Sequence, residues 1–314
     1  MLSLVTLRTH AGKHTHDLTV VRRLTYDESS RYMAAWTHLR ETDKVRELVW
    51  LLEDNLADIR EMISTFEAND NAAGENQSRD NRIRSRRVNA AVVNYLTSVR
   101  LYLDHRRTQL SRRYGNESGE VSALLDACKT TYDKEPVYRF IYKLRNYVQH
   151  CGMPLQVVRI REKLVAEGEI ERRLRTVFIG CDRELLLSAY KDWGPARAFL
   201  EDQPEEFEIH PLLEYVHRLL WNIERACTRA EISDLWEHSR YIVRLLSEAW
   251  DDLHAASVVE VSRASGDPPV TNLHVYDPPL AALKALKFIE EASVPSGWRI
   301  NFDVLEIPHP PSVY

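Results

Sequence analysis

Long apolar segments and paired cysteines are both missing from this 314-residue sequence. It contains no apolar run of 18 residues, roughly the length that a membrane-spanning helix requires, so we expect no membrane partner. The first residues lack the basic and apolar segments of a secretory signal. The four cysteines are scattered and form no C-x-x-C pair, which is typical of buried thiols in a reducing compartment. We therefore expect a cytoplasmic protein without disulfides.

The motifs of phosphate-activating and metal-dependent enzymes are also absent. There is no P-loop, no G-x-S-x-G segment and no spaced Asp/Glu pair that would hold Mg²⁺, so nucleotidyl or phosphoryl transfer fits poorly. His10, His14 and His16 have loose metal-ligand spacing. They stand in a polar stretch with no cysteine nearby, which favours solvated histidines over a zinc site. We expect neither a metal nor another cofactor.

The composition is that of a soluble globular protein, with 44% hydrophobic and 28% charged residues, but the charge is unevenly distributed. Residues 79–175 hold 21 basic and 11 acidic side chains, whereas residues 176–314 hold 12 basic and 23 acidic ones. A basic region of this kind attracts an anionic polymer. A solvated helical face is the alternative interpretation. The cluster that we expect to bind RNA consists of Arg106, Arg107, Arg112 and Arg113.

Hydrophobic periodicity predicts a mainly α-helical fold. Residues 1–26 form an N-terminal segment with two short strands, near 2–8 and 18–26. Helices are then expected to begin near Asp27, Thr42, Asp80, Glu120 and Lys134, the first of them capped by Asp27 or Ser29.

The period changes after Pro154. Residues 155–179 are predicted to form a β-hairpin whose arginines extend the basic surface. The hairpin would either grip a phosphate backbone or cover the helices as a flap. Residues 181–314 are predicted to form an acidic, helical C-terminal region with a Trp-rich helix over 231–256, a helix over 279–292 and a strand over 300–307.

The segment Arg145-Asn146-Tyr147-Val148-Gln149-His150 ends the last of the predicted bundle helices. An imidazole can take the proton of a ribose 2′-hydroxyl, and a guanidinium can stabilise the phosphate that the resulting alkoxide attacks. This chemistry needs no metal. Cys151 follows His150 directly, but neighbouring helical residues point about 100° apart, so a Cys–His nucleophile pair is not expected.

A second Arg-x4-His pair, Arg100 and His105, shows how common the bare spacing is. Residues five apart lie about 140° apart around a helix in both pairs, so geometry does not separate them. Asn146 distinguishes the Arg145/His150 pair from the other one, because it precedes His150 by four residues and can orient its ring. Whether Arg100 and His105 contribute stays open, and a solvated Arg and His at a helix end is the alternative for the hexapeptide itself.

Arg145, Asn146 and His150 resemble the motif of the HEPN superfamily, which carries Arg-x4–6-His, often with Asn after the Arg. The helix over 94–105 is similar to the one preceding that motif, and the resemblance covers roughly residues 30–180. It implies a helical bundle that dimerises, with two motifs in a shared cleft. Many members are metal-independent endoribonucleases that leave 2′,3′-cyclic phosphates and act as toxins or in antiviral defence. Others are non-catalytic scaffolds or nucleotide-binding modules.

The resulting expectation is a HEPN-like bundle over 27–180 in a homodimer that cleaves RNA. His150 would act as general base or acid, Arg145 would stabilise the phosphorane, and Asn146 would orient His150 or the phosphate. Lys143 would add positive charge for RNA binding. An antitoxin or regulatory protein is a further candidate partner. The alternative function is a non-catalytic dimeric scaffold or a nucleotide- or protein-binding module.

Overall fold

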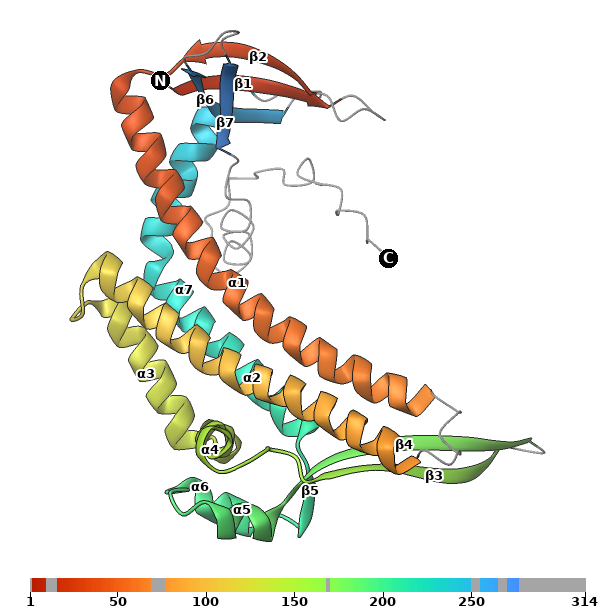
Figure 1. Ribbon diagram of the computed structural model, residues 1–314. Coiled ribbons are helices and arrows are strands. Elements are labelled where there is room, and N and C mark those ends of the chain that lie inside the picture. The colour runs from red at the N-terminus through yellow and green to blue at the C-terminus, as the bar shows by residue number, and fades with distance from the viewer. Residues whose placement is uncertain are drawn as a thin grey trace. The chain divides into compact units, whose positions relative to one another are not determined.

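The computed structural model is mainly helical, with two small antiparallel sheets (Figure 1). The structure describes residues 2–9, 16–68, 77–167, 170–249, 255–264 and 270–276. His10, His14, the predicted helix over 279–292 and the predicted strand over 300–307 lie outside these described residues.

The described chain forms two compact units that do not follow the three consecutive regions expected from the sequence. One unit combines Met1–Lys44 with the chain from Glu231, and the other is Val45–Ala230. Two long helices, α1 (Tyr26–Ala68) and α7 (His210–Leu246), each contribute to both units. Sequence order suggested other boundaries because it cannot show that strands from the two ends of the chain join one sheet.

The first unit contains a four-stranded sheet. Its strands are β1 (Leu2–Thr9), β2 (His16–Arg23), β6 (Ala255–Ala264) and β7 (Val270–Tyr276), in the order β2-β1-β6-β7 and all antiparallel. The two N-terminal strands confirm the prediction. The helix predicted over 231–256 is too long, because α7 ends at Leu246 and the Val-rich segment after it pairs as β6.

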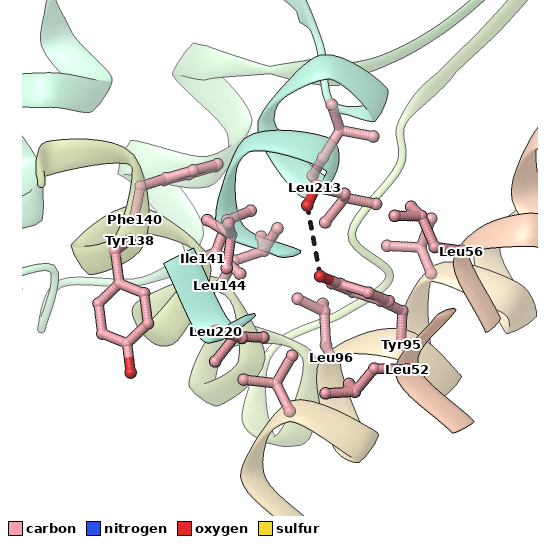
Figure 2. Close-up of a cluster of buried hydrophobic side chains, with 14 of the residues drawn as sticks. Leu52, Leu56, Tyr95, Leu96, Tyr138, Phe140, Ile141, Leu144, Leu213 and Leu220 are labelled. Carbon is pink, nitrogen blue, oxygen red and sulfur yellow. Dashed lines mark hydrogen bonds between the residues drawn. The ribbon is translucent and has the colours of Figure 1, made fainter. Parts of the chain in front are cut away.

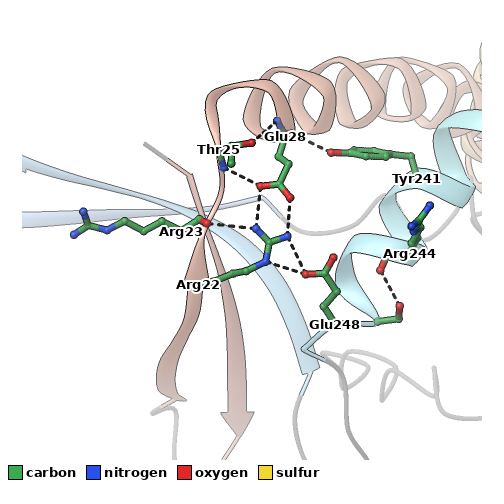
Figure 3. A network of polar contacts seen from close by, with 8 residues as sticks. Arg22, Arg23, Thr25, Glu28, Tyr241, Arg244 and Glu248 are labelled. Carbon is green, nitrogen blue, oxygen red and sulfur yellow. Dashed lines mark hydrogen bonds and ion pairs between the residues drawn. The ribbon is translucent and has the colours of Figure 1, made fainter.

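A capping box begins α1 (Figure 3). The Glu28 amide donates to the Thr25 hydroxyl oxygen, and the Thr25 amide donates to the Glu28 carboxylate. The cap is therefore Thr25, and not Asp27 or Ser29 as predicted. The Arg22 guanidinium donates to both Glu28 and Glu248, which ties β2, α1 and the end of α7 together within this unit.

The second unit is built around a helical bundle. It comprises α1 from Val45, α2 (Gln77–Tyr114), α3 (Gly119–Lys134), α4 (Pro136–His150) and α7 up to Ala230. The break predicted in α1 near Thr42 is absent, because residues 27–68 contain no glycine or proline that would end a helix. The other three predicted helices of this unit are confirmed.

The core of the bundle combines aliphatic side chains of all these helices with buried tyrosines (Figure 2). Leu52 of α1, Tyr95 of α2, Leu144 of α4 and Leu220 of α7 are almost completely buried there. The Tyr95 hydroxyl donates to the Leu213 carbonyl at 3.3 Å, so its one polar atom is satisfied. The core fixes α4 against α2, and this packing places the sequence motif.

A three-stranded sheet follows α4. Strands β3 (Val157–Glu167) and β4 (Ile170–Asp182) confirm the predicted hairpin, and β5 (Glu206–Glu208) joins the edge of β4. The buried Asn89 side chain of α2 exchanges two hydrogen bonds with the backbone of Leu155, just before β3. The hairpin is therefore anchored to the same helix that faces the motif.

Two short helices lie between β4 and β5. They are α5 (Arg183–Ala189) and α6 (Ala196–Glu201). The loop between them carries Trp193, which is fully buried and stacks on Phe140 and Tyr147 of α4 with ring centroids 5.8 and 6.1 Å apart. This aromatic contact covers the side of α4 next to the motif residues.

Candidate functional site between α2 and α4

The motif occupies the last two turns of α4 because the apolar stripe of that helix continues into it. Ile141, Leu144 and Tyr147 are buried. Arg145 and Asn146 are half-buried beside that stripe, and His150 is the exposed last residue of the helix. The helix ends where the amides of Cys151 and Gly152 both donate to the Tyr147 carbonyl. Arg145 and Asn146 therefore stand on a rigid segment, whereas His150 stands at its end.

A pocket of about 350 Å³ lies between α2 and α4. Its polar part combines Arg100 and Asp104 of α2 with Tyr142, Arg145 and Asn146 of α4. Its apolar wall consists of Leu96, Val99, Leu103 and Ile141. The pocket thus brings together the arginines of both Arg-x4-His pairs, which the sequence left as an open question. Two arginines and one aspartate contribute to the lining, so its described residues carry a net positive charge.

Arg100 is held in place at two of its nitrogens. Its Nε donates to the Asp104 carboxylate at 2.8 Å, and Nη1 lies 3.4 Å from the Tyr142 hydroxyl. The Tyr142 ring packs edge-on against Tyr132 of α3, with centroids 6.0 Å apart. These contacts orient the guanidinium toward α4 while its second terminal nitrogen, Nη2, makes no hydrogen bond to any described residue.

Arg145 has no carboxylate partner among the described residues. Nη1 lies 3.4 Å from the Asn146 side-chain oxygen, which is a long and weak contact. Its Nε is shielded from solvent and has no acceptor. A buried donor without an acceptor costs about 1–3 kcal/mol.

The histidines of both pairs lie outside this pocket. His105 and His150 are exposed, neither lines the cavity, and neither makes a side-chain hydrogen bond within the described part of the chain. Arg145 and His150 diverge by about 140° around α4, so one chain does not place them face to face. Asn146, which was expected to orient His150 or the phosphate, contacts Arg145, and it also reaches the hydroxyl of Tyr190. Burial raises the pKa of Tyr190, while this contact with Asn146 acts to lower it.

Lys143 is already paired. Its ammonium lies 2.9 Å from the carboxylate of Asp192, in the loop after α5, and its side chain is only 14% exposed. Burial alone would lower the pKa of Lys143, but the hydrogen bond and the charge of Asp192 outweigh it and raise that pKa. Lys143 therefore stays charged, but Asp192 compensates its charge.

The arginine cluster at the end of α2 does not form one surface. Arg106 is fully buried, and its Nε and Nη2 bind the two oxygens of Glu224 on α7 at 3.1 and 3.2 Å. The prediction that Arg106 binds RNA is therefore wrong, because its guanidinium is enclosed in the core. Arg107 and Arg112 are exposed as expected, and Arg113 lies over the Tyr114 ring.

A sequence signal for the buried position of Arg106 does exist. Val92 and Val99 precede it at intervals of seven residues, so Arg106 continues the buried stripe of α2. Its partner Glu224 is 118 residues away, which local patterning cannot show. In the hairpin, Arg159 pairs with Glu206, and the other four arginines of the hairpin lie outside the residues whose side chains the structure describes.

The remaining reactive groups do not converge on the pocket. No cluster of three or more His, Cys, Asp or Glu side chains within the described ranges has the arrangement of a metal site. Cys151 is exposed, whereas Cys128 is largely enclosed, and burial raises the pKa of its thiol to about 11. None of the described helices combines the length and apolar character needed to cross a membrane.

Comparisons with known proteins add no assignment. No protein-family model matches the chain, and no curated protein or solved structure matches it. The geometry of the pocket and the motif therefore carries the functional argument.

Proposed function

We propose that this protein is a metal-independent endoribonuclease of the HEPN type that leaves 2′,3′-cyclic phosphate ends. The observation that carries the proposal is the Arg145 guanidinium, which lines a positively charged pocket and has no acidic partner among the described residues. An arginine that no protein carboxylate neutralises is suited to a phosphate, whose oxygens match its planar fork of donors.

The proposed reaction uses two side chains of the motif. His150 takes the proton of the 2′-hydroxyl, or gives a proton to the leaving 5′-oxygen, and its exposure allows direct contact with a polymer. Arg145 stabilises the negative charge that develops on the phosphorane. Asn146 orients the phosphate, since its contact with Arg145 is weak enough to be exchanged for one with the substrate.

A homodimer is part of the proposal. Arg145 and His150 point in different directions on α4, so one helix presents them poorly to one phosphate. Two motif helices meeting across a dimer would let the arginine of one chain and the histidine of the other face the same phosphodiester. The same surface would be the one that an antitoxin or regulatory protein covers.

A non-catalytic scaffold or nucleotide- or protein-binding module is the second candidate. One observation favours it: the described structure contains no group that orients the His150 ring, because Asn146 contacts Arg145 and Tyr190 instead. A catalytic base is normally held by a neighbouring group, as in Ser–His–Asp triads.

The deciding experiment is incubation of the purified protein with a mixed RNA pool in EDTA, followed by analysis of the product ends. His150→Ala should lower the cleavage rate by about 10²–10³, as expected for loss of a transition-state group. His105→Ala is the matched control, since it removes an exposed histidine at the same spacing from an arginine on α2, and it should cleave like the wild type. Equal cleavage by the His150→Ala variant would exclude the mechanism. A folded wild type that cleaves nothing would favour the binding module.

A further inference from the structure

Two arginines from different helices line one cavity, although like charges repel each other. Arg100 comes from α2 and Arg145 from α4, and Asp104 is the only acid among the described residues of the lining. Asp104 binds Nε of Arg100, so it compensates one guanidinium at most. The second positive charge stays without a counterion in the pocket, an arrangement that an incoming anion stabilises.

Both guanidinium groups keep donors for a ligand. Asp104 and Tyr142 use Nε and Nη1 of Arg100, while Nη2 has no partner among the described residues. Arg145 uses only Nη1, in the weak contact with Asn146. Two arginines that line the same cavity can bind the oxygens of one phosphate, and arginine is the side chain best suited to that geometry.

The size of the pocket indicates what can accompany the phosphate. Leu96 and Val99 of α2 and Ile141 of α4 line it beside the two arginines, but these side chains are almost completely buried and offer little apolar surface to a ligand. The volume of about 350 Å³ is at the lower end of the range for ligand pockets, roughly 300–1,000 Å³, which suits one nucleotide and excludes a duplex. A base can enter such a pocket only when it is unpaired, as in single-stranded RNA.

We propose that Arg100 and Arg145 together bind one phosphate of a single-stranded RNA. The identification of the ligand as RNA rests on the proposed function, whereas the anion site rests on the pocket itself. Arg100 thereby becomes a substrate-binding residue, and Asp104 competes with the phosphate for it.

The test is fluorescence anisotropy with a labelled, single-stranded 2′-O-methyl RNA, which cannot be cleaved because its 2′-oxygens are blocked. Arg100→Gln and Arg145→Gln should each weaken binding about tenfold, as expected for loss of a charged hydrogen bond. Each should also reduce the slope of log affinity against log salt by about 0.7, the value for one phosphate contact on a single strand. Asp104→Asn should tighten binding, because it removes the competing carboxylate.

Arg197→Gln is the matched control. Arg197 and Glu201 form an exposed ion pair at the same i,i+4 spacing on α6, with 50% exposure of each side chain against 43% and 52% for Arg100 and Asp104. The control loses the same charge outside the pocket, so it should bind the strand like the wild type. Equal melting temperatures of the Arg100→Gln and Arg197→Gln variants would show that the binding defect is not a folding defect.

The outcomes separate this site from the proposed nuclease. Wild-type affinity and salt slope in Arg100→Gln would overturn the site even if His150-dependent cleavage is found. If Arg100→Gln lost binding and the wild type cleaved no RNA, the result would support the anion site and contradict the proposed nuclease activity. Equal competition by a duplex of the same sequence, or by an acidic peptide, would overturn the single-stranded ligand.

Discussion

The guanidinium of Arg106 on α2 is enclosed in the bundle and bound by both oxygens of Glu224 on α7. The Tyr102 hydroxyl donates to the same carboxylate at 2.8 Å, so every charge in this cluster is matched. A buried pair of this kind is weak evidence for net stability, because removal of two ions from water costs much of what their attraction supplies. Removing one member of the pair has a larger effect, because the remaining ion then stays buried without a partner.

Glu224→Gln should therefore destabilise the protein by about 3–5 kcal/mol, the typical cost of leaving one member of a buried ion pair unpaired. Replacing both residues, as Arg106→Met with Glu224→Leu, should cost less than the single change. Urea denaturation measures both. The matched control is Arg107→Gln, an exposed neighbour that should change stability by less than about 0.5 kcal/mol. Additive single and double effects would contradict the coupling.

The capping box at Thr25 predicts a specific acid sensitivity. The Arg22 guanidinium and the Thr25 backbone lower the pKa of Glu28 from its usual 4.5 to about 2. The ionised carboxylate therefore stabilises the fold above pH 4.5, and this contribution is lost as the pH falls from 4.5 toward 2. Glu28→Gln should melt below the wild type at pH 6, and the difference should shrink as the pH falls toward 2 and disappear below it. A difference that stays constant over this range would show that the charge is not the cause.

Gly180 in β4 is needed because the sheet leaves no room for a side chain. A Cβ there would lie 2.3 Å from the Phe178 ring and 3.0 Å from the Phe207 carbonyl oxygen of β5. The ring can move, but the carbonyl cannot without disturbing the pairing of β4 and β5. Gly180→Ala should cost about 1–3 kcal/mol in thermal or urea unfolding. Gly119→Ala, at an open position that begins α3, is the control and should be neutral or slightly stabilising.

The sequence predicted the elements whose signals are local. Periodicity located α2, α3 and α4, and the change of period at Pro154 located the hairpin. It missed β6 and β7. The pairing of β6 with β1 spans more than 200 residues and leaves no local mark, whereas β6 and β7 form a local antiparallel pair that the prediction did not include. The helix predicted over 231–256 extends past the end of α7 at Leu246, since Trp236 and Tyr241 recur at helical spacing up to that point.

The site shows the same division between local and distant information. The motif predicted Arg145, but the pocket that gives Arg145 a role depends on Arg100, 45 residues earlier on another helix. The sequence left open whether Arg100 and His105 contribute, because helix geometry alone treats the two Arg-x4-His pairs equally and only Asn146 favours the second. Packing of α2 on α4 resolves part of this question, since it joins the two arginines and leaves the two histidines outside.

The ion pair between Lys143 and Asp192 leads to a prediction about RNA affinity. Asp192 already compensates the charge of Lys143, so Lys143→Gln should change the affinity for single-stranded RNA by less than about twofold, as expected for a charge already paired with a carboxylate. Asp192→Asn should tighten binding instead, because it releases a positive charge on the α4 segment that carries Arg145. Anisotropy at low salt measures both variants, and the gain from Asp192→Asn should disappear at high salt because screening removes it. If Lys143→Gln weakened binding as much as Arg145→Gln, the ammonium would have to leave Asp192 for the phosphate when RNA binds, and the ion pair would then be a feature of the free protein alone.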